Sequence, residues 1–354
     1  MTNTPLAETF RRLIAATGPI SLAQFMGESN ARYYTSRDPL GAQGDFITAP
    51  EISQMFGELV GLWLADMWIR AGRPDPVHYV ELGPGRGTLA RDALASMRRH
   101  GLEPLVHLVE TSTALKNLQL GAVPDARFHA DLSTIPTNGP ILLAANEFLD
   151  ALPVRQLVLT PDGWRERMVG LVDGGFAFVA GRQPMDAAVP EAQREADVGT
   201  ILEACPAAAA VMYEVTGRLA QQGGAALFID YGHDAPRTGS TLQAVRRHGK
   251  LDPFAAPGEA DLTAHVDFAM LAQIALSREV RWLGTVPQGA WLRALGIDMR
   301  AEMLARGAPD HRDQLMRAHR RLTDDAEMGL LFKVMGLAGP GWPDGEGFSP
   351  LPPA

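Results

Sequence analysis

Short apolar runs alternate with amphipathic segments between residues 77 and 145. Those that predict buried strands span residues 77–82, 106–109, 126–130 and 141–145. The segments between them, 88–99 and 112–120, carry apolar residues at helical spacing. Further apolar runs at 225–230, 280–286 and 330–334 predict three more strands. Because buried strands that alternate with helices are typical of a parallel sheet covered on both faces, we expect a Rossmann-like α/β fold.

Residues 4–72 have a mostly helical pattern. From 52 to 68 the apolar positions follow the i, i+3, i+4, i+7 spacing of an amphipathic helix. Gly57 and Gly61 lie about one turn apart there, which allows a neighbouring element to approach closely. A polar loop at 33–50 precedes this helix, and loops of that length are often lids or binding loops.

The alternation breaks after residue 153. Residues 154–180 predict three antiparallel strands with turns at 161–163 and 173–175, while the Ala-, Pro- and Glu-rich stretch 181–222 and the segments after 230 predict helix. The sequence thus divides into four parts. These are an N-terminal helical region with the long loop (1–72), a core (73–153 and 223–338), an inserted antiparallel β/helical element that shapes a substrate site (154–222), and a flexible Gly- and Pro-rich tail (339–354).

Composition and charge exclude several classes of protein. With 32 basic and 41 acidic residues the net charge is −9, and no basic block is present, which argues against a nucleic-acid partner. Cys205 is the only cysteine, so an intrachain disulfide framework is excluded, and no cluster of histidines has metal-ligand spacing. The first twelve residues contain no apolar leader, and the most apolar stretch, 52–69, carries two acidic residues. We expect a cytoplasmic protein without a metal and without membrane insertion.

A glycine-rich turn follows the first strand of the core. The sequence is Glu81-Leu82-Gly83-Pro84-Gly85-Arg86-Gly87, between a predicted strand and a predicted helix. Its spacing is neither that of the dinucleotide fingerprint nor that of a Walker loop. A carboxylate at position 81 would repel a pyrophosphate but suits a ligand that carries an ammonium or sulfonium group. We therefore expect S-adenosylmethionine, bound by Glu81, Gly83, Pro84, Gly85 and Gly87; the alternative is a tight strand-to-helix connection without a ligand.

Two more acidic positions follow the next strands. Glu110 ends the second strand, where doubly wound folds place a carboxylate on ribose hydroxyls. Asp131, with Leu132 beside it, follows the third strand and is a candidate for contact with adenine. The alternative for Glu110 is a charge that stabilises the N-terminus of the next helix.

Candidate catalytic residues follow the fourth and fifth strands. Glu147 is the main candidate for binding a guanidinium, with Asp150 as a second carboxylate and Asn146 as a polar group near the transferred methyl. His233, after the fifth strand, is a candidate proton acceptor. The alternatives are a helix cap or an ion pair for the two acids, and a loop hydrogen bond for the histidine.

The long early loop offers further cofactor contacts. Asp45 and Thr48 are candidates for meeting the amino-acid end of the cofactor if the loop closes over it. Pro50 and Glu51 can equally be the first turn of the following helix, because proline is favoured at that position.

Several long motifs resemble those of a known family. They are GDFITAPEIS at 44–53, ELGPGRG at 81–87, NEFLDALP at 146–153, DYGH at 230–233, DLTAHVDF at 261–268 and VPQG at 286–289. In this order they resemble the MidA family of class I S-adenosylmethionine-dependent methyltransferases, which is related to the mitochondrial arginine methyltransferase of respiratory complex I assembly. The resemblance covers about residues 5–337.

The resemblance implies a substrate as well as a cofactor. It implies methylation of a protein arginine to symmetric dimethylarginine on a complex I subunit, so the partner would be a protein with an accessible arginine. Two alternatives stay open, because fold and cofactor do not fix the acceptor: a small-molecule methyltransferase, and an assembly chaperone that binds the cofactor but catalyses little. A nicotinamide dehydrogenase fits least, since Thr88 replaces the third fingerprint glycine.

Overall fold

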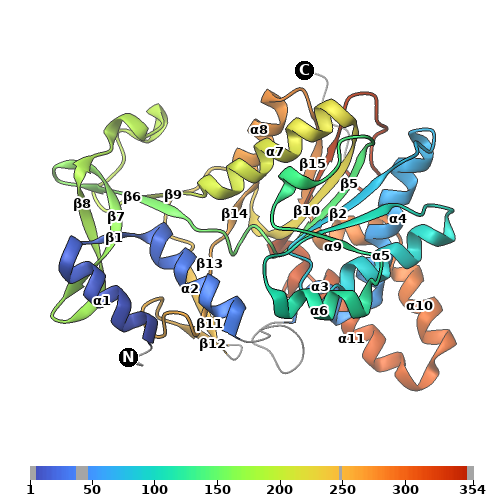
Figure 1. The fold of residues 1–354 in the computed structure, drawn as a ribbon, viewed down its shortest axis with the longest axis horizontal. Coiled ribbons are helices and arrows are strands. Elements are labelled where there is room, and N and C mark those ends of the chain that lie inside the picture. Colours follow the sequence, from blue (N-terminus) through green and yellow to red (C-terminus); the bar gives the residue numbers. More distant parts are fainter. Residues whose placement is uncertain (1–4, 37–46, 247–248, 349–354) are drawn as a thin grey trace.

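A mixed sheet of eight strands forms the centre of the computed structural model, which describes residues 5–36, 47–246 and 249–348 (Figure 1). The strand order is β15-β16-β10-β5-β2-β3-β4, with β14 beside β10. Strands β10, β5, β2, β3 and β4 run parallel, while β16 is antiparallel to both neighbours. Their bounds are β2 His78–Leu82, β3 Leu105–Val109, β4 Arg127–His129, β5 Ile141–Asn146, β10 Gly224–His233, β14 Val266–Asp267, β15 Arg281–Pro287 and β16 Phe332–Ala338. The α/β fold expected from the alternation is confirmed.

Both faces of this sheet are covered by helices. Leu142 and Ala144 of β5 pack in one core with α4 (Gln54–Arg70), α5 (Thr88–Arg99), α9 (Gln288–Ala294) and α10 (Ile297–Gly307). The alternate residues Ile141, Leu143 and Ala145 pack in a second core with α7 (Pro206–Gln222) and α8 (Phe268–Ser277). All six positions of β5 are buried, as expected for the central strand of a two-sided sheet. The remaining helices near this sheet are α3 (Ala49–Ile52), α6 (Thr113–Ala122), α11 (Arg312–Thr323) and α12 (Met328–Leu331).

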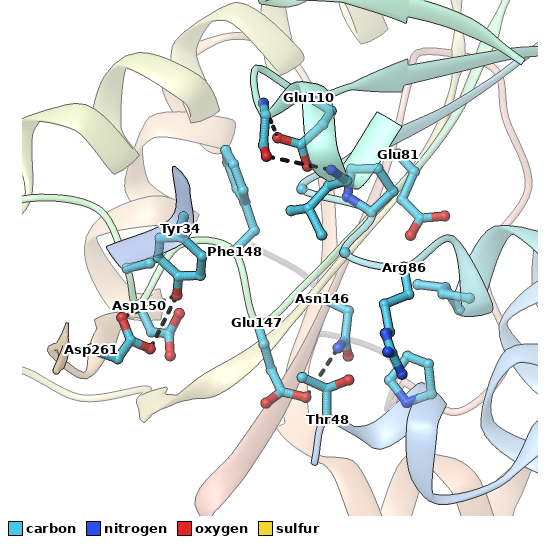
Figure 2. A pocket seen from close by; sticks show the side chains of 18 of the residues that line it. Tyr34, Thr48, Glu81, Arg86, Glu110, Asn146, Glu147, Phe148, Asp150 and Asp261 are labelled. Atoms are coloured by element: carbon cyan, nitrogen blue, oxygen red, sulfur yellow. Dashed lines mark hydrogen bonds between the residues drawn. The ribbon is translucent and has the colours of Figure 1, made fainter. Parts of the chain in front are cut away.

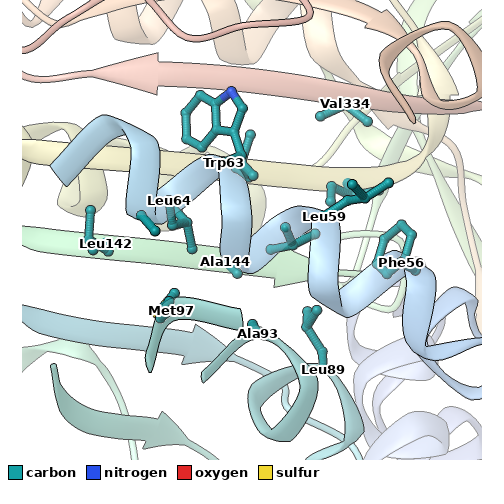
Figure 3. Close-up of a cluster of buried hydrophobic side chains, with 14 of the residues drawn as sticks. Phe56, Leu59, Trp63, Leu64, Leu89, Ala93, Met97, Leu142, Ala144 and Val334 are labelled. Carbon is teal, nitrogen blue, oxygen red and sulfur yellow. The ribbon is translucent and has the colours of Figure 1, made fainter. Parts of the chain in front are cut away.

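Helices α4 and α5 pack against each other at the glycines noted in the sequence. A Cβ on Gly61 would lie 2.6 Å from Ala93 Cα and would also overlap the carbonyl oxygen of Ala93, and one on Gly57 would lie 2.7 Å from Asp92 Cβ. Figure 3 shows the surrounding core, with Ala93 and Met97 of α5 on one side of α4 and Trp63 on the other, towards Val334 of β16. The close approach expected from the glycine spacing is confirmed.

Gly61→Ala should therefore destabilise the protein by roughly 1–3 kcal/mol, because the added methyl group meets backbone atoms that cannot move aside. Gly121→Ala, at an exposed site in α6 with no heavy atom within 4 Å of the new Cβ, is the matched control and should be neutral or slightly stabilising. Urea unfolding of both variants checks this. Equal midpoints for the two would contradict the close packing.

The N-terminal region and the inserted element share one sheet. Its strands are β1 (Ile20–Ser21), β6 (Arg155–Thr160), β7 (Gly163–Val172), β8 (Gly175–Pro184) and β9 (Ile201–Ala204). Helices α1 (Pro5–Thr17) and α2 (Leu22–Ser36) pack on it through a cluster of rings formed by Phe10, Phe25, Phe176 and Phe254. The three strands expected in 154–180 are present, with turns at the expected places.

Other expectations for this part of the chain are wrong. The helix expected over 181–222 is present only from 206, as α7. Residues 181–204 contain no α-helix: they hold the end of β8, two 3-10 helices of one turn each, and strand β9, which pairs with β6, while Val189 packs on Trp164. These buried contacts prevail over the intrinsic helix preference of an Ala- and Glu-rich stretch. Helix α2 extends through Ser36, into the segment expected to be a loop, and residues 37–46 lie outside the described residues.

The segment after β10 is also different from the expectation. Strands β11 (Gln243–Arg246), β12 (Gly249–Leu251) and β13 (Asp261–Thr263) form a small sheet where helix was expected. Helix α8 begins only at Phe268, because Asp267 is its N-cap and accepts the Met270 N–H at 3.0 Å.

The described part of the tail packs on the core. Residues 339–348 contain no helix or strand, but Trp342 is buried and the Trp63 indole donates to the carbonyl of Glu346 at 3.0 Å. The ring of Phe348 lies edge-on to Trp63, with centroids 6.1 Å apart. We expected a flexible tail, and up to residue 348 the structure instead places it over α4.

Three histidines that are far apart in the sequence form a hydrogen-bonded chain across β2, β3 and β4. His78 Nδ1 lies 2.9 Å from His107 Nε2, and His107 Nδ1 lies 2.9 Å from His129 Nε2. Burial lowers the pKa of all three imidazoles, to about 4 for His107, so the chain is neutral near pH 7. We interpret it as a structural link between strands.

No helix among residues 5–36, 47–246 and 249–348 has the length and apolar character needed to cross a membrane.

Candidate active site

A cavity of about 380 Å³ opens at the carboxyl ends of β2, β3 and β5. This is the edge at which parallel sheets bind ligands, and the volume is in the range of small-molecule sites. Figure 2 shows polar side chains entering it from several elements. The predicted site residues that line it are Thr48, Glu81, Gly83, Pro84, Gly85, Glu110, Asn146, Glu147 and Asp150.

The glycine turn has the conformation that its sequence requires. Gly83, Gly85 and Gly87 have φ values of +59°, +53° and +80°, in the left-handed region that favours glycine. A Cβ on Gly83 would lie 2.7 Å from the ring of Phe148. Gly87 does not line the cavity: it begins α5 and lies where a Cβ would be 3.2 Å from Ala122 of α6. The first two glycines form the wall of the cavity, and the third is needed for helix packing.

Glu81 is a buried carboxyl that lines the cavity beside the glycine turn. Its side chain is 2% exposed and accepts the Tyr79 hydroxyl at 2.5 Å, from two residues earlier on the same face of β2. Burial raises the pKa of Glu81 to about 8, although the hydrogen bond from Tyr79 opposes the shift. No cation within the described residues is hydrogen-bonded to it, so a bound positive group would favour the charged form.

Glu110 is held by three donors at the end of β3. Its Oε1 accepts the N–H groups of Thr111 at 2.8 Å and Ser112 at 2.7 Å, and its Oε2 accepts the amide of Gln119 at 3.2 Å. Both the expected helix-end role and a ligand contact are compatible with this arrangement, because the side chain also lines the cavity.

Glu110→Ala should weaken S-adenosylmethionine binding by roughly 1–3 kcal/mol, the scale for losing a hydrogen bond to a charged group. Glu103→Ala, an exposed glutamate just before the same strand, is the control and should bind normally. Calorimetric titration of both variants tests this, and an unchanged affinity for Glu110→Ala would leave only the helix-end role.

Asn146 is the last residue of the central strand β5, and Glu147 follows it. Glu147 has a φ of +49°, an uncommon value for a residue with a side chain, and its N–H donates to the Ile229 carbonyl at 2.8 Å. Its Oε1 accepts the Ala49 N–H at 3.0 Å and the Asn146 amide at 3.1 Å. Burial raises the pKa of Glu147 to about 7. Glu147 therefore caps a helix, which was one of the alternatives from the sequence. The helix it caps is α3, which precedes Glu147 in the chain.

Asp150 lies beside a second buried carboxyl. Asp230 accepts the N–H groups of Leu149 at 2.9 Å and Asp150 at 3.2 Å, and thereby ties the loop after β5 to β10. Burial raises the pKa of both aspartates, and the Tyr231 hydroxyl hydrogen-bonds to Asp150. Asp230 thus has a structural role in this loop.

Sequence reasoning did not identify two side chains at the same end of the cavity. Tyr34 of α2 and Asp261 of β13 both line it, and the Tyr34 hydroxyl is 3.1 Å from each carboxylate oxygen of Asp261 (Figure 2). Asp261 opens one of the motifs quoted above, which was a usable signal. Tyr34 lay in a segment expected to be a loop, and no feature of the sequence marked it as a site residue.

The structure does not bring every candidate to the cavity. His233 lines a separate, much smaller pocket and its Nδ1 is 2.8 Å from the Ala235 carbonyl, because β10 turns aside there to pair with β14. Asp131 is exposed and caps a short 3-10 turn that contains the buried Leu132, at the outer edge of the sheet. Contact of Asp131 and Leu132 with a cofactor stays a prediction. Asp45 lies outside the described residues.

Comparison with known proteins agrees on one family. The sequence model of a family described as S-adenosyl-L-methionine-dependent methyltransferases matches residues 59–286. The mitochondrial protein arginine methyltransferase NDUFAF7 of Rattus norvegicus is 37% identical, over 94% of this chain and 84% of its own. The Homo sapiens protein of that name is 36% identical, and the match covers 94% of this chain and 83% of that protein.

A solved structure agrees with this assignment. A Burkholderia thailandensis protein, crystallised with S-adenosyl-homocysteine bound, superposes on the chain with a TM-score of 0.83. The two sequences are 28% identical, and the superposition covers 98% of this chain and 97% of that one.

The residues in the cavity fit S-adenosylmethionine. Gly83 and Gly85 leave the backbone open to a ligand, Glu81 and Glu110 offer carboxylates, and the buried Oδ1 of Asn146 has no hydrogen-bond partner among the described residues. A ligand with a cationic centre and several donors would satisfy these groups. S-adenosylmethionine is the cofactor of this enzyme, and the chain belongs to the MidA family of S-adenosylmethionine-dependent methyltransferases.

Proposed function

We propose that this methyltransferase acts on arginine side chains of a protein. The observation that carries the proposal is a pair of carboxyls at the cavity beside the glycine turn, the buried Asp150 and the half-buried Glu147. Both have raised pKa values because burial disfavours their charged forms. An arginine side chain would supply the missing positive charge and, with its planar fork of N–H donors, match two carboxylates. The names of the NDUFAF7 relatives support the same acceptor.

Glu147 is suited to two tasks in the transfer. When bound, S-adenosylmethionine supplies a methyl group whose bond to the sulfonium sulfur breaks as a carbon–nitrogen bond forms. The guanidinium nitrogen that becomes methylated must lose a proton, and a carboxylate with a pKa of about 7 can accept it near neutral pH. Oε1 of Glu147 already accepts two N–H groups, whereas Oε2 makes no hydrogen bond to any described residue. Oε2 is therefore the atom that would receive the proton.

The finer assignment rests on the family resemblance. We propose symmetric dimethylation of a respiratory complex I subunit during assembly as the reaction of this chain, with that subunit as its partner. The curated relatives are named as mitochondrial proteins, so they do not support the cytoplasmic location expected from the sequence, which stays a prediction.

Isotope transfer tests the proposal. The purified enzyme is incubated with methyl-labelled S-adenosylmethionine and cell extract, and the labelled protein is identified by mass spectrometry. Matched peptides with arginine or lysine at the labelled position are then compared, because a lysine ammonium cannot reproduce the two-pronged contact. We expect label on arginine and little transfer to the lysine peptide. Label confined to small molecules would support the small-molecule alternative, and tight cofactor binding without any label would support the chaperone alternative.

A further inference from the structure

Phe148 carries a half-buried aromatic ring on the loop that also bears Glu147 and Asp150. The ring lines the cavity and packs against the second core, the one formed with α7 and α8. Its side chain points away from that of Glu147 and towards Glu110 (Figure 2). Neither the binding of an acceptor nor the transfer of its proton uses this ring, so its place in the cavity calls for a role of its own.

The ring of Phe148 meets the glycine turn at its edge. A Cβ on Gly83 would lie 2.7 Å from Cδ2 and 3.5 Å from each of the two ring carbons bonded to Cδ2. A group above the ring would be almost as close to those two carbons as to Cδ2, so these distances place Gly83 near the plane of the ring. The turn therefore leaves the faces of the ring uncovered, and it is the face of an aromatic ring that attracts cations.

The strand order brings this ring to the expected position of the cofactor's sulfonium. Glu110, the predicted ribose contact, follows β3, and the predicted adenine contacts Asp131 and Leu132 follow β4. Gly83 follows β2 and Phe148 follows β5, and the sheet has the order β5-β2-β3-β4. In S-adenosylmethionine the sulfonium is joined to the ribose through one methylene, on the side away from the adenine. With the ribose at β3 and the adenine towards β4, the sulfonium lies over β2, where Phe148 meets Gly83.

An aromatic ring at this position distinguishes the methyl donor from its product. S-adenosylmethionine carries a positive sulfonium, and loss of the methyl group leaves the neutral sulfide of S-adenosylhomocysteine. Attraction between a ring face and a cation is worth roughly twofold to thirtyfold in affinity, and a neutral sulfide lacks it. Glu81 also favours a cation in the cavity, so the contribution of the ring has to be measured with Glu81 in place.

We propose that Phe148 contacts the sulfonium of S-adenosylmethionine through a face of its ring, so that the enzyme binds the methyl donor in preference to the demethylated product. This contact concerns the cofactor and is the same for any acceptor, so it goes beyond the proposed arginine specificity and does not depend on it. The product lacks the charge and therefore leaves the site more readily after each transfer. Glycine is required at position 83 because a side chain there would displace the ring.

Calorimetric titration with the two ligands tests this assignment. Phe148→Leu removes the ring but keeps an apolar side chain. It should weaken the binding of S-adenosylmethionine by roughly twofold to thirtyfold more than the binding of S-adenosylhomocysteine. Phe348→Leu, at a half-buried phenylalanine outside the cavity, is the matched control and should bind both ligands as the wild type does. Retained binding of S-adenosylhomocysteine by Phe148→Leu also shows that its site is folded.

A second variant separates attraction of the cation from packing. Pentafluorophenylalanine, introduced at position 148 alone, keeps an aromatic ring of similar shape but withdraws the electron density from its faces. It should weaken the binding of S-adenosylmethionine and leave that of S-adenosylhomocysteine nearly unchanged. Equal weakening of both ligands in the two variants would mean that the ring packs on a part that the ligands share. That result, or an unchanged affinity for S-adenosylmethionine in both variants, would overturn this inference. The proposed function would stand in either case, because transfer of label to arginine peptides tests it separately.

Discussion

Glu147→Gln should lower methyl transfer about a hundredfold or more and leave the affinity for S-adenosylmethionine nearly unchanged, a loss on the order of 3 kcal/mol of transition-state stabilisation. The amide oxygen of glutamine can still accept the N–H groups of Ala49 and Asn146 that Glu147 Oε1 accepts now, so the fold of this loop is preserved. The variant lacks the negative charge that pairs with a guanidinium and the oxygen that receives its proton.

A pH profile makes this prediction more specific. Only ionised Glu147 can accept a proton, and its pKa is raised to about 7, so the wild-type rate should increase as pH rises through that value. Glu147→Gln should lose this dependence. Glu302→Gln, which alters an exposed glutamate paired with Arg312, is the control and should keep both rate and profile. An active glutamine variant with the wild-type profile would remove Glu147 from the mechanism.

Glu81→Gln should make the protein more stable without ligand and weaken its binding of S-adenosylmethionine. The pKa of Glu81 is raised to about 8 in the folded state, so the stability that its protonated form contributes is present below the unfolded pKa and lost as pH rises towards 8. Glutamine is neutral at every pH and can still accept the Tyr79 hydroxyl that Glu81 accepts. Relative to wild type, the variant should gain roughly 2–4 kcal/mol between pH 4.5 and pH 8, by the linkage between pKa and stability.

Thermal unfolding across pH checks the stability part, and calorimetric titration checks the binding part. The difference between variant and wild type should grow with pH and be smallest near pH 4.5. Glu103→Gln, at an exposed position, serves as the control with no pH-dependent difference. A constant difference at all pH values would mean that ionisation of Glu81 does not lower the stability of the folded protein. Unchanged binding would mean that the charge of Glu81 does not contact the cofactor.

Local patterns in the sequence were sufficient for most of the sheet and for bringing several candidate carboxyls to one cavity. The helix expected at 88–99 is α5 with the same bounds, because it lies between a glycine turn and a polar stretch. Glu81, Glu110 and Glu147 reach one cavity because each lies at the carboxyl end of a parallel strand, and these ends meet at one edge. Order along the chain is thus enough to group them.

Contacts across the chain were not available from the sequence. Tyr34 meets Asp261 only because α2 packs against β13, and the pairing of β1 with β7 likewise joins distant segments. His233 shows the opposite error: its position after a strand suggested the site, but the pairing of β10 with β14 leads the chain away from the cavity. Such packing depends on buried area gained in the whole fold, which no local periodicity records.

The place of β16 has a consequence for synthesis of the protein. β16 (Phe332–Ala338) leaves the ribosome last among the strands of the described residues, yet it lies inside the sheet between β10 and β15. Until it emerges, β10 presents an open edge of backbone donors and acceptors, and Trp63 is not yet covered by residues 339–348. The nascent chain is therefore exposed to aggregation until β16 has emerged, and chaperones that bind nascent chains should protect it up to that stage.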